Sequence, residues 1–364
     1  MNSDQHGRWF RSRLFPFVTG QPLDLDLTFL ANARQFAVPE VLTMELVFTG
    51  TVTPVGGTYQ GEDTAKLFSV VNFRDEAEMI NASGNSLRHL AMEELGSAYV
   101  DPADINVGVA TAVEYHLPIM FEPPETKAVR PRDYRVPLAN FLEGGNLVVN
   151  LAAALPTNMG VVAGDWNVQV NFFIKDGRVK ELKTRRRIWD QVINVQEWEY
   201  PINGSIRNAL ITSNLTTTGY TALTAFTTIF SRTLDLPPAF SVQQLREYYR
   251  RNQLNASTVD EFLAAAPSAI PFVIPERKKK IGQMIDTPTL HIDLLRAAPA
   301  SGRLLVDAVV NRPPNITALA AGYGSPEELA AAIQARGVVV GEGGNFPAKE
   351  CPRSLARKMC IRIK

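Results

Sequence analysis

Apolar and polar residues alternate along three stretches in the first half of the chain. Apolar side chains occupy every second position in residues 41–53, and residues 113–119 and 168–174 repeat the pattern. A period of two is typical of a β-strand with one face in a hydrophobic core. Because the strands alternate and are not apolar throughout, we expect antiparallel sheets. The third stretch ends at Asp176-Gly177, a dipeptide typical of a β-hairpin turn.

The pattern predicts few helices, and all of them are short. A polar helical run is expected at residues 86–95, with Glu93 and Glu94 on its solvated face. Further helices are expected at residues 241–251, after a capping box at Ser241, at 258–266, and at 325–337, after Ser325-Pro326. Helices do not alternate regularly with strands, so a parallel sheet built from βαβ units is not expected.

Two segments of the chain are similar in their order of features. The run 68–74 has a counterpart at 226–232, and each is followed at the same interval by a Leu-Arg pair that opens a helical run. The run 145–151 has a counterpart at 302–308. A nearly constant offset predicts a tandem duplication of a domain-sized β unit, with Phe68 equivalent to Phe226 and Leu147 to Leu304. The alternative is that any two β-rich domains share strands of this composition.

The length and charge of the chain are consistent with two soluble domains. The chain has 364 residues, of which 45% are hydrophobic and 20% charged. The predicted division is an N-terminal arm at 1–24, a first β domain at 25–188, a second at 189–315, and a helix and tail at 316–364 that complete or flank the second domain.

With 37 basic and 37 acidic residues the net charge is zero, which argues against a protein that coats nucleic acid. Zero net charge also does not oppose the close packing of identical chains.

The N-terminal arm has a composition of its own. Three arginines alternate with aromatic residues in its first twenty positions, and Asp4 is the only acid. This composition suits a membrane–water interface or an acidic partner surface. The alternative is a terminus whose aromatic side chains pack into a neighbouring hydrophobic groove. The candidate contact residues are Arg8, Trp9, Phe10, Arg11, Arg13, Phe15 and Phe17.

Two other basic runs occur, at residues 183–187 and 277–280. The first lies where we place the boundary between the domains, within residues 176–200. We expect each run to be a solvated strand end or connector. The alternatives are contact with lipid head groups, with a genome, or with acidic residues of a neighbouring subunit.

The sequence contains no recognisable catalytic or metal-binding motif. The four histidines, at positions 6, 89, 116 and 291, are scattered, and none has the spacing of a zinc site. His116 and His291 lie in strand-like stretches and are expected to be structural. Cys351 and Cys360 lack nearby histidines and are expected to be reduced thiols. No phosphate-binding loop and no Gly-x-Ser-x-Gly motif is present. We therefore expect no catalytic residue, no cofactor and no metal, and not an enzyme.

Targeting signals are equally absent from the sequence. No run approaches the roughly 20 apolar residues of a membrane-spanning helix, and the N-terminus lacks the apolar segment of a signal peptide. Synthesis and folding in the cytoplasm of a host cell are therefore expected.

The order of these elements resembles the double jelly-roll major capsid proteins of tailless, membrane-containing icosahedral bacteriophages of the tectivirus type. The resemblance covers roughly residues 25–310 and is architectural, without a signature motif. It rests on the strands at 41–53, 68–75 and 145–151, the helix at 86–95, and their counterparts at 226–232, 241–251 and 302–310. The last 50 residues have no counterpart in that pattern.

The resemblance implies an all-β fold of two tandem antiparallel eight-stranded jelly-roll β-sandwiches with a few short helices. It further implies a structural coat protein that assembles as pseudo-hexameric homotrimers into an icosahedral virion shell. The expected partners are other copies of the chain in the trimer and in neighbouring capsomers, an internal viral membrane and minor capsid proteins, with no specific nucleic-acid binding. In this family the N-terminal segment commonly lies on the inner, membrane-facing side. The competing hypothesis is a carbohydrate- or receptor-binding β-sandwich, either a viral spike or a glycan-active enzyme.

Overall fold

The computed structural model describes most of the first half of the chain and the main strands of the second. The described residues are 7–25, 27, 29, 30, 33, 36, 39–75, 77–95, 98–121, 136–138, 146–176, 184–193, 197–213, 226–229, 269–272, 285–294 and 302–311. The chain consists of two compact units, Met1–Arg312 and Pro313–Lys364. All of the described residues belong to the first unit.

One sheet of the first unit has six strands and is antiparallel throughout. Its central strands follow the order β1-β10-β4-β7, while β2 pairs with β10 and β8 with β4. Its strands are β1 (Arg8–Arg11), β2 (Phe15–Pro16), β4 (Pro39–Val52), β7 (Thr111–Met120), β8 (Val136–Pro137) and β10 (Asn167–Asp176). The three strands predicted from alternation are therefore confirmed as β4, β7 and β10.

The predicted faces of these strands are also confirmed. In β7 the side chains of Val113, Tyr115, Leu117 and Ile119 are buried, while the intervening residues are exposed or half-buried. In β10 every even-numbered residue from 168 to 174 is fully buried. Alternating polarity thus determines which face of the sheet packs inward.

The second sheet has ten strands and extends through both halves of the chain. Its order is β13-β15-β12-β16-β11-β6-β5-β9-β3, and β14 pairs with β12. The first-half strands are β3 (Pro22–Leu25), β5 (Phe68–Asp75), β6 (Ala77–Ala82) and β9 (Asn146–Leu151). The second-half strands are β11 (Thr184–Ile193), β12 (Glu197–Ser213), β13 (Phe226–Ile229), β14 (Ala269–Phe272), β15 (Ile285–Leu294) and β16 (Gly302–Asn311). All of these pairings are antiparallel except that of β11 with β6.

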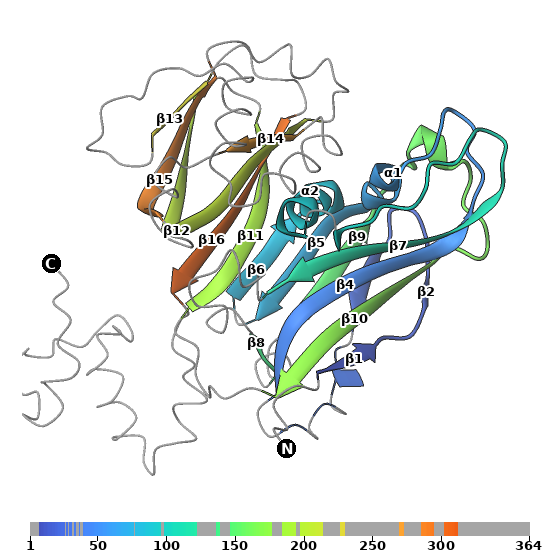
Figure 1. The fold of residues 1–364 in the computed structure, drawn as a ribbon, viewed down its shortest axis with the longest axis horizontal. Coiled ribbons are helices and arrows are strands. Elements are labelled where there is room, and N and C mark those ends of the chain that lie inside the picture. The colour runs from blue at the N-terminus through green and yellow to red at the C-terminus, as the bar shows by residue number, and fades with distance from the viewer. Residues whose placement is uncertain are drawn as a thin grey trace, which may run out of the picture. The chain divides into compact units, whose positions relative to one another are not determined.

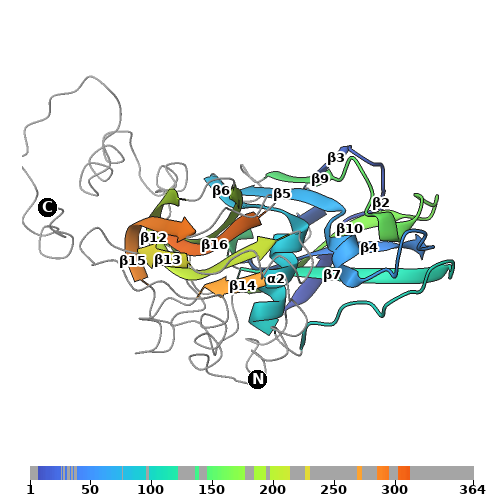
Figure 2. The ribbon, with the colours of Figure 1, turned by 90° about the horizontal axis from the view of Figure 1, so that it is seen from above.

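The core of the first half lies between the two sheets. Figure 2 shows β5 and β9 in one layer and β4, β7 and β10 in the other. Buried side chains of both layers form one hydrophobic cluster, in which Phe73 of β5 and Phe121 lie with their ring centroids 5.6 Å apart. Two facing antiparallel sheets with a shared core constitute a β-sandwich. The number of eight strands per jelly roll stays a prediction.

Two α-helices lie beside the first-half sandwich (Figure 1). They are α1 (Gly61–Ala65) and α2 (Gly84–Leu95), and a 3-10 turn, η5, spans Thr157–Met159. The helix predicted at residues 86–95 is confirmed as α2, which contacts α1, β5 and β7. Ser83 precedes α2 and accepts a hydrogen bond from the amide of Ser86 (3.3 Å), as an N-cap residue does.

The predicted equivalence of the repeated segments is wrong in detail. The first-half anchors lie in β5 and β9, which are neighbours in the ten-stranded sheet. The second-half anchors lie in β13 and β16, and β15 and β12 separate these two strands. Short strands with a glycine, polar residues and aliphatic residues recur in any antiparallel sheet, so their similarity does not define their position.

The described strands on either side of the Asp176-Gly177 pair, β10 and β11, do not form a hairpin with each other. Strand β10 ends at Asp176 in the six-stranded sheet, and the next strand, β11, pairs with β6 and β16 in the other sheet. The chain therefore passes from one sheet to the other at this point. The predicted division between residues 188 and 189 falls within β11, and the division into domains stays a prediction.

Several expectations lie outside the described residues. They concern the helices at 241–251, 258–266 and 325–337, the basic run at 277–280, His6, and the two cysteines.

Candidate functional site: a buried joint and a basic edge strand

Arg186 of β11 lies at the centre of the joint between the two halves. Its side chain is 1% exposed although it carries a positive charge. Its Nε donates to Oδ1 of Asp307 in β16 (2.8 Å) and its Nη2 donates to Oδ2 (2.9 Å). Two parallel hydrogen bonds of this kind are the strongest geometry for an arginine–carboxylate pair.

The same guanidinium group also binds the first half of the chain. Nη2 donates to Oε1 of Glu94 at the end of α2 (2.5 Å), and Nη1 donates to Oε2 of Glu94 (3.4 Å) and to the carbonyl oxygen of Met120. Burial alone would lower the pKa of Arg186, but the charges of Asp307 and Glu94 raise it above its usual value. Arg186 therefore stays charged and links β11 and β16 of the second half to α2 and β7 of the first.

A second polar cluster connects the same parts of the chain. Asp190 of β11 accepts hydrogen bonds from the amide (2.9 Å) and hydroxyl (2.7 Å) of Ser83, the residue before α2. Arg303 of β16 donates to both oxygens of Asp190, at 2.9 and 2.6 Å. Burial would raise the pKa of Asp190, but its bonds with Arg303 and Ser83 lower it. This aspartate is therefore ionised and joins the start of α2 to β11 and β16.

Backbone pairing adds to these side-chain contacts. β11 pairs in parallel with β6 at Ile188 and Trp189. Beside this short ladder, Arg187 contacts Glu78 (3.3 Å) and its guanidinium carbon lies 4.6 Å from the ring centroid of Trp189. We call the residues Glu94, Arg186 and Asp307, together with Ser83, Asp190 and Arg303, the joint.

The joint was not predicted, and two predictions about its residues are wrong. Arg186 belongs to the basic run at 183–187, which was expected to be solvated or to meet an external acidic partner, yet it is bound inside the chain. Glu93 and Glu94 were placed on a solvated helix face, but both are buried. One signal was present in the sequence: Asp307 interrupts the apolar run 304–308, and a lone acid at such a position indicates a buried ion pair.

The N-terminal arm forms the edge of the six-stranded sheet. β1 pairs with β10 from Arg8 opposite Ile174 to Arg11 opposite Asn171, and β2 continues along the same strand. Between β1 and β2, the hydroxyl oxygen of Ser12 accepts a hydrogen bond from the amide of Val170 (3.0 Å). Residues 8–17 are therefore part of the sandwich.

The aromatic residues of the arm pack onto the same chain to different degrees. Phe17 is buried, with its ring centroid 5.6 Å from that of Trp166. Phe10 and Phe15 are partly buried against the core. Trp9 remains 48% exposed, with its ring 5.2 Å from that of Phe173.

The cationic residues of the arm face the solvent. Arg8, Arg11 and Arg13 are exposed, and the guanidinium carbon of Arg13 lies 4.9 Å from the ring centroid of Phe15. Leu14 and Val18 are exposed beside them. We call Arg8, Trp9, Arg11, Arg13, Leu14 and Val18 the basic strip.

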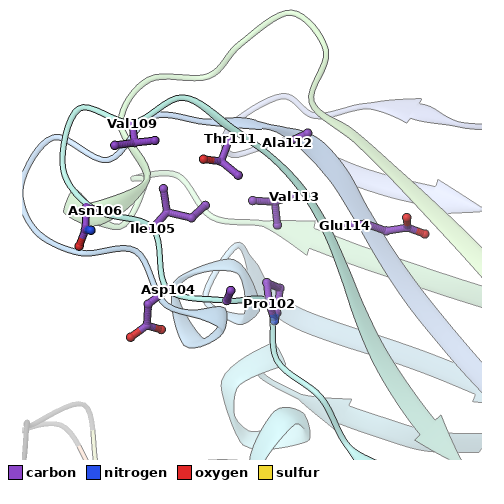
Figure 3. Close-up of a pocket in the computed structure, with 10 residues that line it drawn as sticks. Pro102, Asp104, Ile105, Asn106, Val109, Thr111, Ala112, Val113 and Glu114 are labelled. Carbon is purple, nitrogen blue, oxygen red and sulfur yellow. The ribbon is translucent and has the colours of Figure 1, made fainter.

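A shallow groove of about 410 Å³ lies at the opposite edge of this sheet. Its walls are the loop that begins at Pro102 and the first residues of β7, as Figure 3 shows. Val109, Ala112 and Val113 give it an apolar lining, while Asp104 and Glu114 add acidic groups. We call it the acidic groove.

The structure describes the surroundings of His116 and His89. His116 lies between Glu45 and Glu114, with its ring nitrogens 2.9 Å from a carboxylate oxygen of each. The hydrogen bond with Glu45 is the largest influence that raises the pKa of His116. His89 of α2 is fully buried, and neither of its ring nitrogens has a hydrogen-bond partner. Among the described residues, no group of three or more His, Cys, Asp and Glu side chains is arranged to hold a metal ion.

The helices in the described part of the chain are all too short or too polar to span a membrane.

Comparison with known proteins gives matches to structures alone. No family model and no curated protein sequence matches the chain. The structure is similar to the crystal structure of the major capsid protein of Sulfolobus Turreted Icosahedral Virus, with a TM-score of 0.56 and 12% identity over 86% of this chain and 100% of that one. It is also similar to VP54 of PBCV-1, with a TM-score of 0.50 and 8% identity over 84% of this chain and 94% of that one.

A further match is the major capsid protein P2 of bacteriophage PM2, with a TM-score of 0.48 and 13% identity over 85% of this chain and 99% of that one. Because the sequence identities to the first two structures are only 12% and 8%, the likeness establishes the fold alone. The first half of the chain has two layers, a ten-stranded sheet extends through both halves, and the matches cover most of both chains. The chain therefore has the fold of the double jelly-roll major capsid proteins.

Proposed function

We propose that this chain is a major capsid protein, a structural and non-enzymatic component of an icosahedral virion shell. The observation that carries the proposal is the similarity to the major capsid protein of Sulfolobus Turreted Icosahedral Virus, because it extends over the whole of that chain. Shared fold alone does not fix function. A likeness that includes both halves of the chain is more specific than a likeness of a single β-sandwich. The competing hypothesis of a glycan- or receptor-binding sandwich receives no support from the matched structures.

The joint suits this role for a physical reason. A coat protein must keep its two halves in a fixed relation while it forms lateral contacts with neighbouring copies. Arg186 is bound to carboxylates of both halves and is excluded from water, so separating the halves would expose or unpair a buried charge. Such a separation is costly. The zero net charge allows copies to pack closely.

We further propose that three copies form a homotrimer with a pseudo-hexagonal outline, and that trimers pack into the shell. Two similar sandwiches per chain give a trimer six similar units at its perimeter. The basic strip is proposed to lie at the inner surface, where a neighbouring subunit, a minor capsid protein or an internal membrane would contact it.

Light scattering on the purified full-length chain tests the trimer. At micromolar concentration we expect a species of three times the 40.1 kDa mass of one chain, with interfaces of the obligate size of roughly 2,000 Å² or more. Negative-stain images should show a particle with a six-sided outline. A species of 40.1 kDa at every concentration tested would contradict the proposal.

A further inference from the structure

The two outer edges of the six-stranded sheet differ in charge. Along the order β1-β10-β4-β7, the basic strip lies on β1 and on the chain that follows it, while the acidic groove lies against the beginning of β7. The strip and the groove therefore lie at opposite edges of the six-stranded sheet. Two different and complementary surfaces on opposite sides of a chain are what a head-to-tail contact requires.

The loops at the end of the sheet beside the acidic groove carry aspartates and exposed apolar side chains. Three loops meet there, at residues 53–60, 98–110 and 152–166, and they contain neither lysine nor arginine. Of their three aspartates, Asp101 is paired with Arg88 of α2. Val55 is 68% exposed and Val161 is 81% exposed, and Val107 and Val109 are also exposed. Exposed apolar side chains gathered at one place commonly mark a contact surface. The absence of cations from these loops makes an anionic lipid or a nucleic acid an unsuitable ligand for them.

The groove is held in one shape by contacts within the chain. The amide of Gly108 donates to the carbonyl of Pro54 (2.8 Å), and Tyr59 and Ile105 form an antiparallel bridge. Arg88 of α2 binds Asp101, at the start of the groove loop, through Nε and Nη2. A surface that is already ordered loses little conformational entropy on binding, which favours affinity.

The basic strip has the complementary character. It presents three cationic side chains, the exposed ring of Trp9, and the exposed side chains of Leu14 and Val18. Arginine and tryptophan are the residue types that contribute most often to binding energy at protein interfaces. The apolar residues of the strip match the valine and alanine lining of the groove, and its arginines match Asp104. The other acid of the groove, Glu114, already contacts His116 through Oε1.

We propose that the basic strip of one copy docks into the acidic groove of a second copy of this chain. The inference rests on the proposed trimer and names the surfaces that form it. Because the strip and the groove are different surfaces, each copy uses its strip on one neighbour and its groove on another. Such a contact repeats around a ring, and three copies close it.

The first arm of the test is a cross-link between two differently substituted full-length chains. Both chains carry Cys351→Ser and Cys360→Ser. One adds Arg13→Cys in the strip, and the other adds Asp104→Cys in the groove. The chains are dissociated, mixed and oxidised. We expect a disulfide-linked dimer that contains one chain of each kind. The matched control replaces Asp104→Cys with Val192→Cys, an exposed position of β11 (47%) outside both surfaces.

The second arm reverses charge and leaves the native cysteines in place. Arg13→Glu alone, or Asp104→Arg alone, should weaken trimer formation by about tenfold or more, because each places like charges at the contact. A chain carrying both substitutions should recover trimer formation, since residues 13 and 104 have exchanged their charges and attract each other again. Circular dichroism verifies that each variant is folded, and trimer content is measured by analytical ultracentrifugation.

The outcomes separate this inference from the proposed function. A trimer that forms normally in all charge variants, with cross-linking no greater than in the Val192 control, would overturn the docking of strip into groove and leave the capsid proposal intact. If the unaltered chain is monomeric at every concentration, both fall. Binding of the unaltered trimer to phosphatidylserine vesicles that is lost in Arg13→Glu, with trimer content unchanged, would assign the strip to lipid and also overturn the inference.

Discussion

Arg186 and Asp307 are 121 positions apart in the chain, yet their side chains share two hydrogen bonds of 2.8 and 2.9 Å in the buried joint. Glu94, 92 positions from Arg186, completes the cluster from the first half of the chain. Paired charges of this kind are not necessarily more stabilising than apolar residues would be. We expect their main effect to be specificity, because an arrangement of the halves that separates Arg186 from Glu94 would break a buried ion pair.

Replacing Arg186 alone is expected to destabilise the protein strongly. Arg186→Met removes the guanidinium group that binds Glu94 and Asp307 in a buried site, and the loss of one partner of a buried ion pair costs about 3–5 kcal/mol. Urea denaturation followed by tryptophan fluorescence measures the change in the free energy of unfolding. The matched control is Arg187→Met, which breaks a partly exposed pair with Glu78 and the contact with the Trp189 ring, and should cost about 1–2 kcal/mol.

A triple variant tests whether the remaining carboxylates cause the destabilisation of Arg186→Met. Arg186→Met with Glu94→Met and Asp307→Leu removes the arginine together with both of its carboxylate partners, so most of the lost stability should return. If the triple variant is as unstable as Arg186→Met alone, unpaired carboxylates are not the cause of the destabilisation.

His89 is expected to make the protein sensitive to acid. Its burial lowers its pKa from 6.5 to about 3, so the folded state keeps the ring neutral where the unfolded state binds a proton. The stabilising contribution is therefore complete above pH 6.5 and is lost as the pH falls from 6.5 towards about 3. Each pH unit in this window costs up to about 1.4 kcal/mol.

The comparison that tests this is His89→Leu against the unaltered chain. Chemical denaturation at several pH values should give a smaller loss of stability below pH 6.5 in the variant, by about 2 kcal/mol near pH 5. Identical pH profiles for the two proteins would show that His89 does not titrate on unfolding.

Two loop glycines provide a matched pair of backbone tests. Gly108 and Gly160 have φ angles of +79° and +80°, a region that side chains disfavour. A Cβ at Gly108 would meet open space, whereas one at Gly160 would overlap the carbonyl oxygen of Thr53. Gly108→Ala should therefore cost only the backbone strain of about 1–2 kcal/mol. Gly160→Ala should lower the melting temperature clearly more, and equal shifts for the two variants would contradict the predicted overlap.

The parts of the fold that depend on local pattern could be predicted from the sequence. β4, β7 and β10 follow from alternating polarity, and α2 was found within two residues of its start. The sheet order was not predicted, because the partner of a strand depends on the whole chain. The Asp176-Gly177 signal illustrates this: the dipeptide favours a turn but does not specify which strand follows in which sheet.

The joint could not be predicted for the same reason. A buried ion pair requires partners that meet only after folding, and neither residue 94 nor residue 186 carries a local mark of burial. The arm residues were identified by composition alone. Their pairing with β10, which turns the arm into an edge strand, requires knowledge of which strand has a free edge.

The two halves are expected to unfold in one cooperative transition. β11 and β16 contact α2 and the residue before it through the six residues of the joint, and β11 pairs with β6 in the same sheet. Unfolding either half alone would therefore break the contacts of Arg186 with Glu94 and of Asp190 with Ser83. Calorimetry of the unaltered protein should give a single peak, and amides of β4 and β12 should show similar hydrogen-exchange protection. In Arg186→Met combined with Asp190→Asn, the peak should broaden or split, while Arg187→Met keeps a single peak. Two separate peaks in the unaltered protein, with β12 exchanging before β4, would show that the joint does not couple the halves.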